Sequence, residues 1–331
     1  MEILFWAVIF FLTTALLVRS ADWLLASAEK IGLAAGLSPF IVGATIVGIG
    51  TSFPELVSSI AAVLSGATEI VAANAIGSNI ANILLVVGLV SLLGGRIVVT
   101  KSLIDLDLPL LAVSTVLFLA AAWDRIITFP EAIFLLIAYA IYLLYTILHT
   151  EEEAVAESGI RALFHKRRKV ESLLHEEQTN RPKILPKDIM FLAFGIAGLA
   201  FSAKYLIDSV IALSTLLHIA TGTLAITAVA IGTSLPELIV SAKAALGRKS
   251  EVALGNIFGS NIFNVLAVIG IPGLFQTLAL DEPTYAIGLP ALAATTILFI
   301  ISGVSMRFHV WEGAFYLVLY TFFLGKLFQL L

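Results

Sequence analysis

The sequence predicts an all-α polytopic membrane protein, whose ten transmembrane helices form two inverted-topology repeats of five. Three observations support this fold class. The chain of 331 residues is 60% hydrophobic and 13% charged, with a mean hydropathy of +1.04, whereas a soluble domain carries about 25% charged residues. Five hydrophobic segments precede one long polar stretch and five follow it. The two halves also repeat each other at a constant offset.

Ten hydrophobic segments are long enough to cross a hydrocarbon layer of roughly 30 Å as helices. Their predicted bounds are 3–29, 38–64, 70–94, 104–123, 127–148, 188–214, 222–246, 252–275, 285–303 and 310–329. We therefore divide the chain into a first five-helix repeat at 1–148, a loop at 149–187 and a second five-helix repeat at 188–331. The sequence has no cysteine, which excludes disulfides and thiolate metal sites.

The long polar stretch determines the predicted orientation. It holds eight of the nineteen Lys and Arg residues, so the positive-inside rule places it in the cytoplasm. Counting helices outward, the other cytoplasmic turns contain Lys30, Arg96, Arg248 and Arg307, and all of them are basic. Both termini are then extracytoplasmic, and we expect a multi-pass protein of the plasma membrane. With five helices each, the two halves have opposite orientations.

An offset of 182 residues aligns the motif region 41–88 with the region 223–270, and 22 of the 48 aligned positions are identical. The sequence GTSFPE at 50–55 matches GTSLPE at 232–237, and GSNIAN at 77–82 matches GSNIFN at 259–264. Inverted repeats are recurrent in alternating-access transporters, where the substrate site lies near the midplane between the repeats. The sequence therefore predicts a site built by both halves.

Each copy of the first motif interrupts a hydrophobic helix. Pro54 and Pro236 cannot donate a backbone hydrogen bond, and Gly50 and Gly232 relax the backbone further. A break of this kind frees carbonyl oxygens in the middle of the membrane. These oxygens must face protein or a polar cavity, because lipid cannot hydrogen-bond to them.

The side chains beside the breaks all offer oxygen ligands: Thr51, Ser52, Glu55, Thr233, Ser234 and Glu237. In the second motif, Ser78 and Asn82 share one helix face because they lie four residues apart, and Ser260 and Asn264 repeat this spacing. Hard cations such as Na⁺ and Ca²⁺ prefer oxygen ligands, whereas transition metals prefer imidazole or thiolate. Two ionised glutamates neutralise one Ca²⁺. Competition at a single cluster then gives antiport, which is electrogenic if three Na⁺ replace one Ca²⁺.

The paired motifs GTSFPE…GSNIAN and GTSLPE…GSNIFN resemble the two α-repeats of the Ca²⁺/cation antiporter superfamily, and specifically of its prokaryotic Na⁺/Ca²⁺ exchangers. The resemblance covers the whole chain, because ten helices and a central cytoplasmic loop also match. It implies that Ca²⁺ is bound by the carboxylates of Glu55 and Glu237 and by the backbone carbonyls of Thr51 and Thr233.

The resemblance also implies a set of Na⁺ sites that shares both glutamates. Its other members are Ser52, Ser78, Ser234, Ser260 and the backbone carbonyls of Gly48 and Ala230, with Asn82 and Asn264 lining the middle of the cluster. Some archaeal members carry an aspartate at the position of Asn264. The neutral residue makes the two halves of this chain symmetric, and it bears on the ion stoichiometry.

Two rival classes are a cation channel and an intramembrane hydrolase. An internally duplicated, occluding cluster fits a carrier better than a pore, and no nucleotide-binding loop of the GxxxxGKS type occurs in the sequence. Within the carriers, the alternative is H⁺/Ca²⁺ exchange; the neutral asparagines and the hydroxyl-rich GTS segments favour Na⁺. We therefore expect a secondary transporter rather than an enzyme. It needs no cofactor, nucleic acid or obligate protein partner, and it interacts with the lipid bilayer, Na⁺ and Ca²⁺.

Two further pairs of equivalent positions carry charge. Glu69 and Glu251 lie near predicted helix starts, where a carboxylate complements the helix dipole; ion entry is the alternative role. Asp22 and Lys204 are equivalent positions of opposite sign. They are either snorkelling residues or a pair between the repeats, and the sequence leaves both interpretations open.

Overall fold

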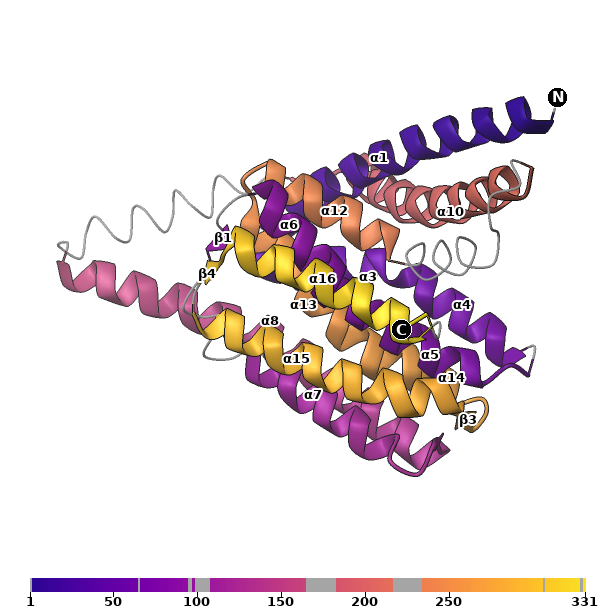
Figure 1. Ribbon diagram of the computed structural model, residues 1–331. Coiled ribbons are helices and arrows are strands. Elements are labelled where there is room, and N and C mark those ends of the chain that lie inside the picture. The colour runs from indigo at the N-terminus through magenta and orange to yellow at the C-terminus, as the bar shows by residue number, and fades with distance from the viewer. Residues whose placement is uncertain are drawn as a thin grey trace.

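A computed structural model describes residues 2–64, 66–94, 97–98, 108–164, 183–216, 234–305, 307–327 and 330–331. Its described elements are almost all helical, and each of the ten predicted segments contains helix within this part of the chain (Figure 1). Seven of the described helical segments are long and apolar enough to cross a membrane. The protein is thus an all-α membrane protein, as the sequence predicts.

In the first half, α1 (Glu2–Ala35) precedes a discontinuous segment made of α2 (Pro39–Val42), the π-helical turn η1 (Gly43–Val47), α3 (Gly48–Thr51) and α4 (Phe53–Leu64). The next segment combines α5 (Glu69–Ala81), η2 (Asn82–Val86) and α6 (Val87–Gly94). The half continues through β1 (Ile97–Val98), α7 (Leu108–Ala121), β2 (Ile126–Ile127) and α8 (Phe129–Phe164).

The second half has the same order. It contains α10 (Pro186–Leu216), α12 (Leu235–Leu246), α13 (Ser250–Phe263), η4 (Asn264–Val268), α14 (Ile269–Gly273), β3 (Leu278–Ala279), η5 (Thr284–Gly288), α15 (Leu289–Val304), β4 (Arg307–Phe308) and α16 (Val310–Leu327). The π-helical turns η2 and η4 lie at positions related by the 182-residue offset.

Two short antiparallel strand pairs show the inverted relation of the halves. Ile97 pairs with Phe308, and Ile126 pairs with Ala279. Adding 182 to 97 gives 279, and subtracting it from 308 gives 126, so exchanging the halves turns one pair into the other. The pairs lie at opposite ends of the bundle, with β1 and β4 at the left and β3 at the right in Figure 1. Equivalent residues of the two repeats therefore face opposite ends.

The helices differ in how much of their surface is buried. α1 and α10 pack along each other at one edge of the bundle, and α13 and α5 lie in its middle (Figure 1). Every residue from Val252 to Phe263 of α13 is buried. Glycines allow this central position: a Cβ at Gly259 would lie 1.9 Å from the carbonyl oxygen of Ala44, and one at Gly255 would lie 2.2 Å from that of Phe40. The backbones of α13 and of the α2–η1 segment are therefore in direct contact.

Two helices extend beyond the hydrophobic segments from which they were predicted. α1 continues to Ala35 instead of ending near residue 29. α8 continues to Phe164, so part of the predicted 149–187 loop is helical. The sequence EEEAVAESGIRALF explains this extension, because Glu, Ala, Leu and Arg are strong helix formers. Hydropathy marks the end of a membrane segment, but it does not mark the end of a helix.

Candidate functional site

The first broken helix changes direction at Ser52. This residue has φ −88° and ψ 5°, between α3 and α4, and its backbone N–H donates to the carbonyl of Gly48 at 3.1 Å. Pro54 follows in the first turn of α4, where a missing N–H is tolerated. Gly48, Gly50 and Thr51 are all buried in α3. The break therefore lies inside the protein and not at its lipid surface.

The second half has the same geometry where the structure describes it. Ser234 has φ −92° and ψ 6°, and α12 begins at the next residue with Pro236 in its first turn. Glu237 occupies the position that Glu55 occupies in α4. Three of the predicted site residues, Ala230, Gly232 and Thr233, lie outside the described residues.

The helices α5 and α13, which pack against the broken helices, supply the second set of polar side chains. Ser78 on α5 and Ser260 on α13 each lie one turn before the asparagine that begins a π-helical turn, Asn82 in η2 and Asn264 in η4. All four side chains are buried. π-helical turns are rare and are frequent at functional sites, because the extra residue changes the direction of the side chains on one helix face.

The two sets of side chains form one cluster across the repeats. The Ser52 hydroxyl donates to Oε1 of Glu237 at 2.8 Å. The Ser260 hydroxyl donates to the carbonyl of Gly48 at 3.2 Å and lies 3.3 Å from the hydroxyl of Thr51. The first break thus contacts residues of α12 and α13, which lie more than 180 positions later in the sequence.

The two glutamates belong to the same cluster. Both are 0% exposed, and Ser52, which lies three residues before Glu55, donates its hydroxyl to Glu237. The two glutamates therefore belong to one buried region that both repeats build.

Several buried polar atoms of the cluster have no hydrogen-bond partner among the described residues. They are both carboxylate oxygens of Glu55, Oε2 of Glu237, the hydroxyls of Ser78 and Ser234, and the carboxamide O and N of Asn82 and Asn264. A buried carboxylate without a partner costs several kcal/mol, on the order of a lost buried ion pair. A cation bound among these oxygens would remove that cost.

The composition of the cluster indicates which cations fit. Within the described part of the chain, no group of three or more His, Cys, Asp and Glu side chains gathers as a metal site. The ligands available are two carboxylates together with hydroxyl, amide and backbone carbonyl oxygens. Hard cations that accept many oxygen ligands fit this set, whereas transition metals do not.

Sequence reasoning assigned no role to one repeated pair, Asn74 and Asn256. In the structure, each donates its carboxamide N–H to groups on the helix that carries the glutamate of its own repeat. The signal was present in the sequence, because both asparagines are identical at the 182-residue offset.

The charged pair Asp22 and Lys204 does not form. Asp22 pairs with Lys243 of α12 instead, and the ammonium of Lys204 lies 5.1 Å from the ring centroid of Tyr205. Asp22 therefore does link the repeats, but through a partner that is not its equivalent. Residues of α1 make two more such contacts, Glu29 with Lys249 and Lys30 with Asp188, the latter at 2.6 Å.

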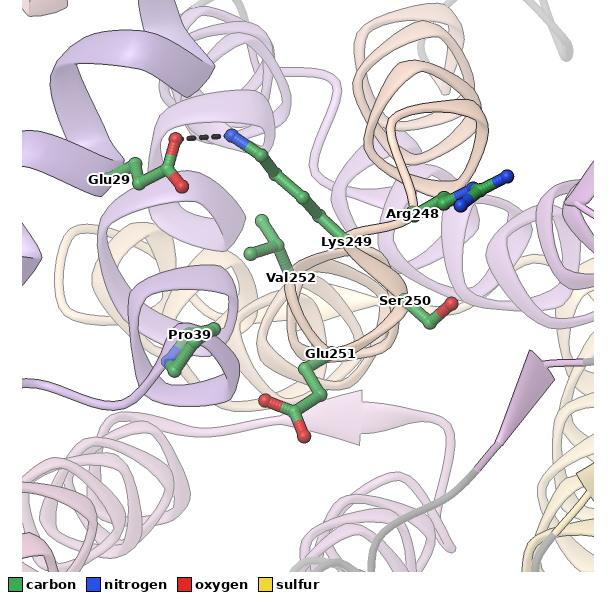
Figure 2. Close-up of a pocket in the computed structure, with 7 residues that line it drawn as sticks. All are labelled: Glu29, Pro39, Arg248, Lys249, Ser250, Glu251 and Val252. Atoms are coloured by element: carbon green, nitrogen blue, oxygen red, sulfur yellow. Dashed lines mark hydrogen bonds and ion pairs between the residues drawn. The ribbon is translucent and has the colours of Figure 1, made fainter.

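A cavity of about 370 Å³ lies apart from the cluster, at the turn between α12 and α13. Its lining residues are Glu29, Pro39, Arg248, Lys249, Ser250, Glu251 and Val252. Figure 2 shows that Lys249 reaches Glu29, while Glu251 points away from this pair. Glu69 and Glu251 both lie in the first turn of their helices, where a carboxylate complements the helix dipole.

Comparison with known proteins gives a consistent picture. The family model described as "Sodium/calcium exchanger protein" matches residues 5–148 and 187–329. The chain is 33% identical to the sodium/calcium exchanger MaX1 of Methanosarcina acetivorans, over 95% of this chain and 96% of the relative. It is 31% identical to the inner membrane protein YrbG of Escherichia coli, over 86% and 84%. A solved structure of the sodium-calcium exchanger NCX_Mj superimposes with a TM-score of 0.76 at 27% identity, covering 98% of this chain and 99% of that chain.

Proposed function

Because the chain belongs to the sodium/calcium exchanger family, we propose that it exchanges Na⁺ for Ca²⁺ across the membrane by alternating access. Family membership makes it an integral membrane cation exchanger and a secondary transporter. The coupling ion is proposed to be Na⁺. The alternative, H⁺/Ca²⁺ exchange, predicts that an H⁺ gradient drives the transport of Ca²⁺.

One observation supports the proposal most strongly. Two fully buried glutamates from oppositely oriented repeats, Glu55 and Glu237, belong to one cluster whose other polar groups are neutral. Two carboxylates match the charge of one Ca²⁺. The same oxygens can instead hold Na⁺, and the two ions then exclude each other because they need the same negative charge. Mutual exclusion at one site is the requirement for antiport.

We assign the ligands as follows. Ca²⁺ is held by the carboxylates of Glu55 and Glu237 and by the backbone carbonyls of Thr51 and Thr233. Na⁺ uses the same glutamates together with the hydroxyls of Ser52, Ser78, Ser234 and Ser260 and the carbonyls of Gly48 and Ala230. Asn82 and Asn264 line the centre between them. The buried oxygens of this set that have no partner among the described residues support the assignment.

Na⁺ rather than H⁺ is proposed because of the neutral centre. In proton-coupled exchange, Glu55 and Glu237 alone would have to take up the protons when Ca²⁺ leaves, because Asn82 and Asn264 cannot do so. Hydroxyl and carbonyl oxygens such as those of Ser260 and Gly48 are ligands for Na⁺, but they do not bind protons near neutral pH. The exchange is electrogenic if more Na⁺ charge than Ca²⁺ charge crosses in each cycle.

We also propose the orientation of the chain. The first repeat spans 1–148 and the second 188–331, with the 149–187 segment cytoplasmic and both termini on the outer side of the plasma membrane. In Figure 1 the N-terminus and the end of α16 lie toward the right, whereas the far end of α8 lies at the left. This arrangement supports termini on the side opposite the central segment.

Cysteine labelling tests the orientation, since the native chain has no thiol. A cysteine introduced at Ser172, which lies outside the described residues, should react with an impermeant maleimide only after the cells are opened. A cysteine at Glu2 serves as the matched control and should react in intact cells. Labelling of the Ser172→Cys variant in intact cells would reverse the orientation.

The transport assay uses purified protein in liposomes. ⁴⁵Ca²⁺ uptake should be driven by an outward Na⁺ gradient and should not be driven by an outward H⁺ gradient of equal size. Uptake with the H⁺ gradient alone would favour H⁺/Ca²⁺ exchange. Uptake without either gradient, down the Ca²⁺ gradient only and without saturation, would indicate a channel.

A further inference from the structure

Asn74 and Asn256 lie next to the proposed ion cluster but are not among its assigned ligands. On α5, residues 74, 78 and 82 are spaced four apart, so Asn74 continues the helix face that carries Ser78 and Asn82. On α13, Asn256 stands in the same relation to Ser260 and Asn264. Each asparagine therefore lies one helical turn before the serine of its own repeat.

In the first repeat, Asn74 contacts the helix that carries Glu55. Its Nδ2 lies 3.3 Å from the carbonyl oxygen of Glu55 and 3.2 Å from the hydroxyl of Ser59. A third contact, 3.2 Å to the hydroxyl of Ser58, is on the exposed side. Ser59 lies one turn after Glu55 and is fully buried.

The second repeat has the same contacts in equivalent positions. Nδ2 of Asn256 lies 2.8 Å from the hydroxyl of Ser241 and 3.5 Å from the carbonyl oxygen of Glu237. Ser241 lies one turn after Glu237 and is fully buried. Glutamate, serine and asparagine thus form the same arrangement twice. Ser58 has no counterpart, because Val240 occupies its equivalent position.

Asn256 makes one further contact, which joins the two repeats. The Thr51 hydroxyl donates to Oδ1 of Asn256 at 3.0 Å. The carboxamide therefore uses its N–H on the helix of Glu237 and its oxygen on the break of the other repeat. Asn256 is 0% exposed, so water cannot readily replace either contact, and loss of the carboxamide leaves buried groups without partners.

We propose that Asn74 and Asn256 are positioning residues for the two glutamates, and that Asn256 in addition couples the position of Glu237 to that of Thr51. The inference rests on the proposed function, since it concerns the site where Ca²⁺ binds. Neither asparagine contacts the ion. Each holds the backbone of a glutamate-bearing helix in register with the ligand face of α5 or α13, and Asn256 holds both halves of the Ca²⁺ site at their mutual distance.

The test measures Ca²⁺/Ca²⁺ exchange in proteoliposomes, which needs no Na⁺. Asn256→Ala should raise the KM for Ca²⁺ about tenfold, the effect of one or two lost buried hydrogen bonds, and should change the maximal rate less than twofold. Asn74→Ala should raise the KM about threefold, because Asn74 is partly exposed and water can bond to the groups that its carboxamide leaves. Ser58→Val, which copies Val240 of the other repeat, removes the exposed contact of Asn74 and the hydrogen bond from Ser58 to the Glu55 carbonyl, and it should raise the KM less than Asn74→Ala does.

Two variants test separately the hydrogen bond to Oδ1 of Asn256 and the hydrogen bond from its Nδ2. Thr51→Val removes the hydroxyl donor and keeps the Thr51 backbone carbonyl, while Ser241→Ala removes the partner of Nδ2. Each should raise the KM for Ca²⁺ severalfold. If the coupling runs through Asn256, the double variant Thr51→Val/Asn256→Ala should have the KM of Asn256→Ala alone.

A second readout distinguishes positioning from simple stabilisation. The melting temperature of each purified variant is measured in detergent with and without Ca²⁺. Positioning predicts a smaller Ca²⁺-induced rise in melting temperature. If Asn256→Ala, Thr51→Val and Ser241→Ala lower the melting temperature but keep the wild-type KM and Ca²⁺-induced rise, the asparagines are only structural and the inference is wrong. Failure of the wild-type protein to exchange Ca²⁺ at all would instead contradict the proposed function. If Asn256→Ala cannot be purified, the two single variants decide the question.

Discussion

The two broken helices have the same sequence motif but different surroundings. In the second repeat, Oε1 of Glu237 accepts a hydrogen bond from Ser52, whereas neither carboxylate oxygen of Glu55 has a hydrogen-bond partner among the described residues. Asn256 is fully buried, while Asn74 is half-buried. Equivalent residues therefore make different contacts in one and the same structure.

The helices α13 and α5, which pack against the broken helices, also differ in how many of their residues are buried. α13 has twelve consecutive buried residues from Val252 to Phe263, whereas eight of the thirteen residues of α5 are buried. A Cβ at Gly259 would meet the backbone of Ala44, whereas one at the equivalent Gly77 would meet no described atom within 4 Å. The segment of the second half that corresponds to Ala44 lies outside the described residues. A carrier built from inverted repeats must break its symmetry in each state, because access from one side differs from access from the other. Among the described residues, α13 is the more fully buried of the two helices.

Removing one carboxylate should have the largest effect of all. Glu55→Gln and Glu237→Gln should each reduce Ca²⁺ transport at least ~100-fold, since one charge cannot balance Ca²⁺ and an unbalanced buried charge costs about 3–5 kcal/mol. Transport in proteoliposomes is the measurement, with membrane insertion checked in parallel. If the asymmetry of contacts meant that only one glutamate binds Ca²⁺, one of the two variants would exchange at nearly the wild-type rate.

A smaller effect is expected from alanine substitutions at the equivalent glycines of α13 and α5. Gly259→Ala should lower the stability by about 1–3 kcal/mol, because the added methyl group meets the backbone of Ala44. Gly77→Ala should destabilise the protein less than Gly259→Ala does, since no described atom lies within 4 Å of a Cβ at Gly77 and alanine favours the helix. Thermal unfolding in detergent measures both. Equal destabilisation by the two variants would mean that α5 and α13 are packed alike.

Much of this fold follows from the sequence, for physical reasons. Hydropathy locates the helices because the bilayer demands long apolar segments. The 182-residue repeat predicts the inverted arrangement, which the two strand pairs of the structure display. Helix ends were less predictable: α8 extends past the apolar segment because the next residues favour helix without being hydrophobic.

The contacts between the repeats were the least predictable part. Comparing equivalent positions matched Asp22 with Lys204, but Asp22 pairs with Lys243 because contacts across the two halves join non-equivalent residues. The roles of Asn74 and Asn256 were missed for a related reason. Repetition marks a position as constrained in both halves, but only the packing of two helices shows which atoms it holds.

The hydroxyl ligands should have the smallest effect on Ca²⁺ and a larger one on Na⁺. Replacing Ser78 and Ser260 together by alanine removes neutral ligands and leaves both charges in place. The Na⁺ concentration that supports half-maximal exchange should rise severalfold, since each lost buried partner costs about 1–3 kcal/mol. Na⁺/Ca²⁺ and Ca²⁺/Ca²⁺ exchange are compared in the same proteoliposomes. Equal weakening of both modes would mean that these serines shape the helices and do not bind Na⁺.

Equilibrium binding of ⁴⁵Ca²⁺ to the purified protein tests the central claim, that the two repeats share one cation site. The wild-type chain should bind one Ca²⁺, and Na⁺ should displace it competitively. Glu55→Gln and Glu237→Gln should each abolish this binding, although the two glutamates have different contacts in the structure. Two bound Ca²⁺ per chain, with each variant losing one and keeping the other at its original Kd, would contradict the account.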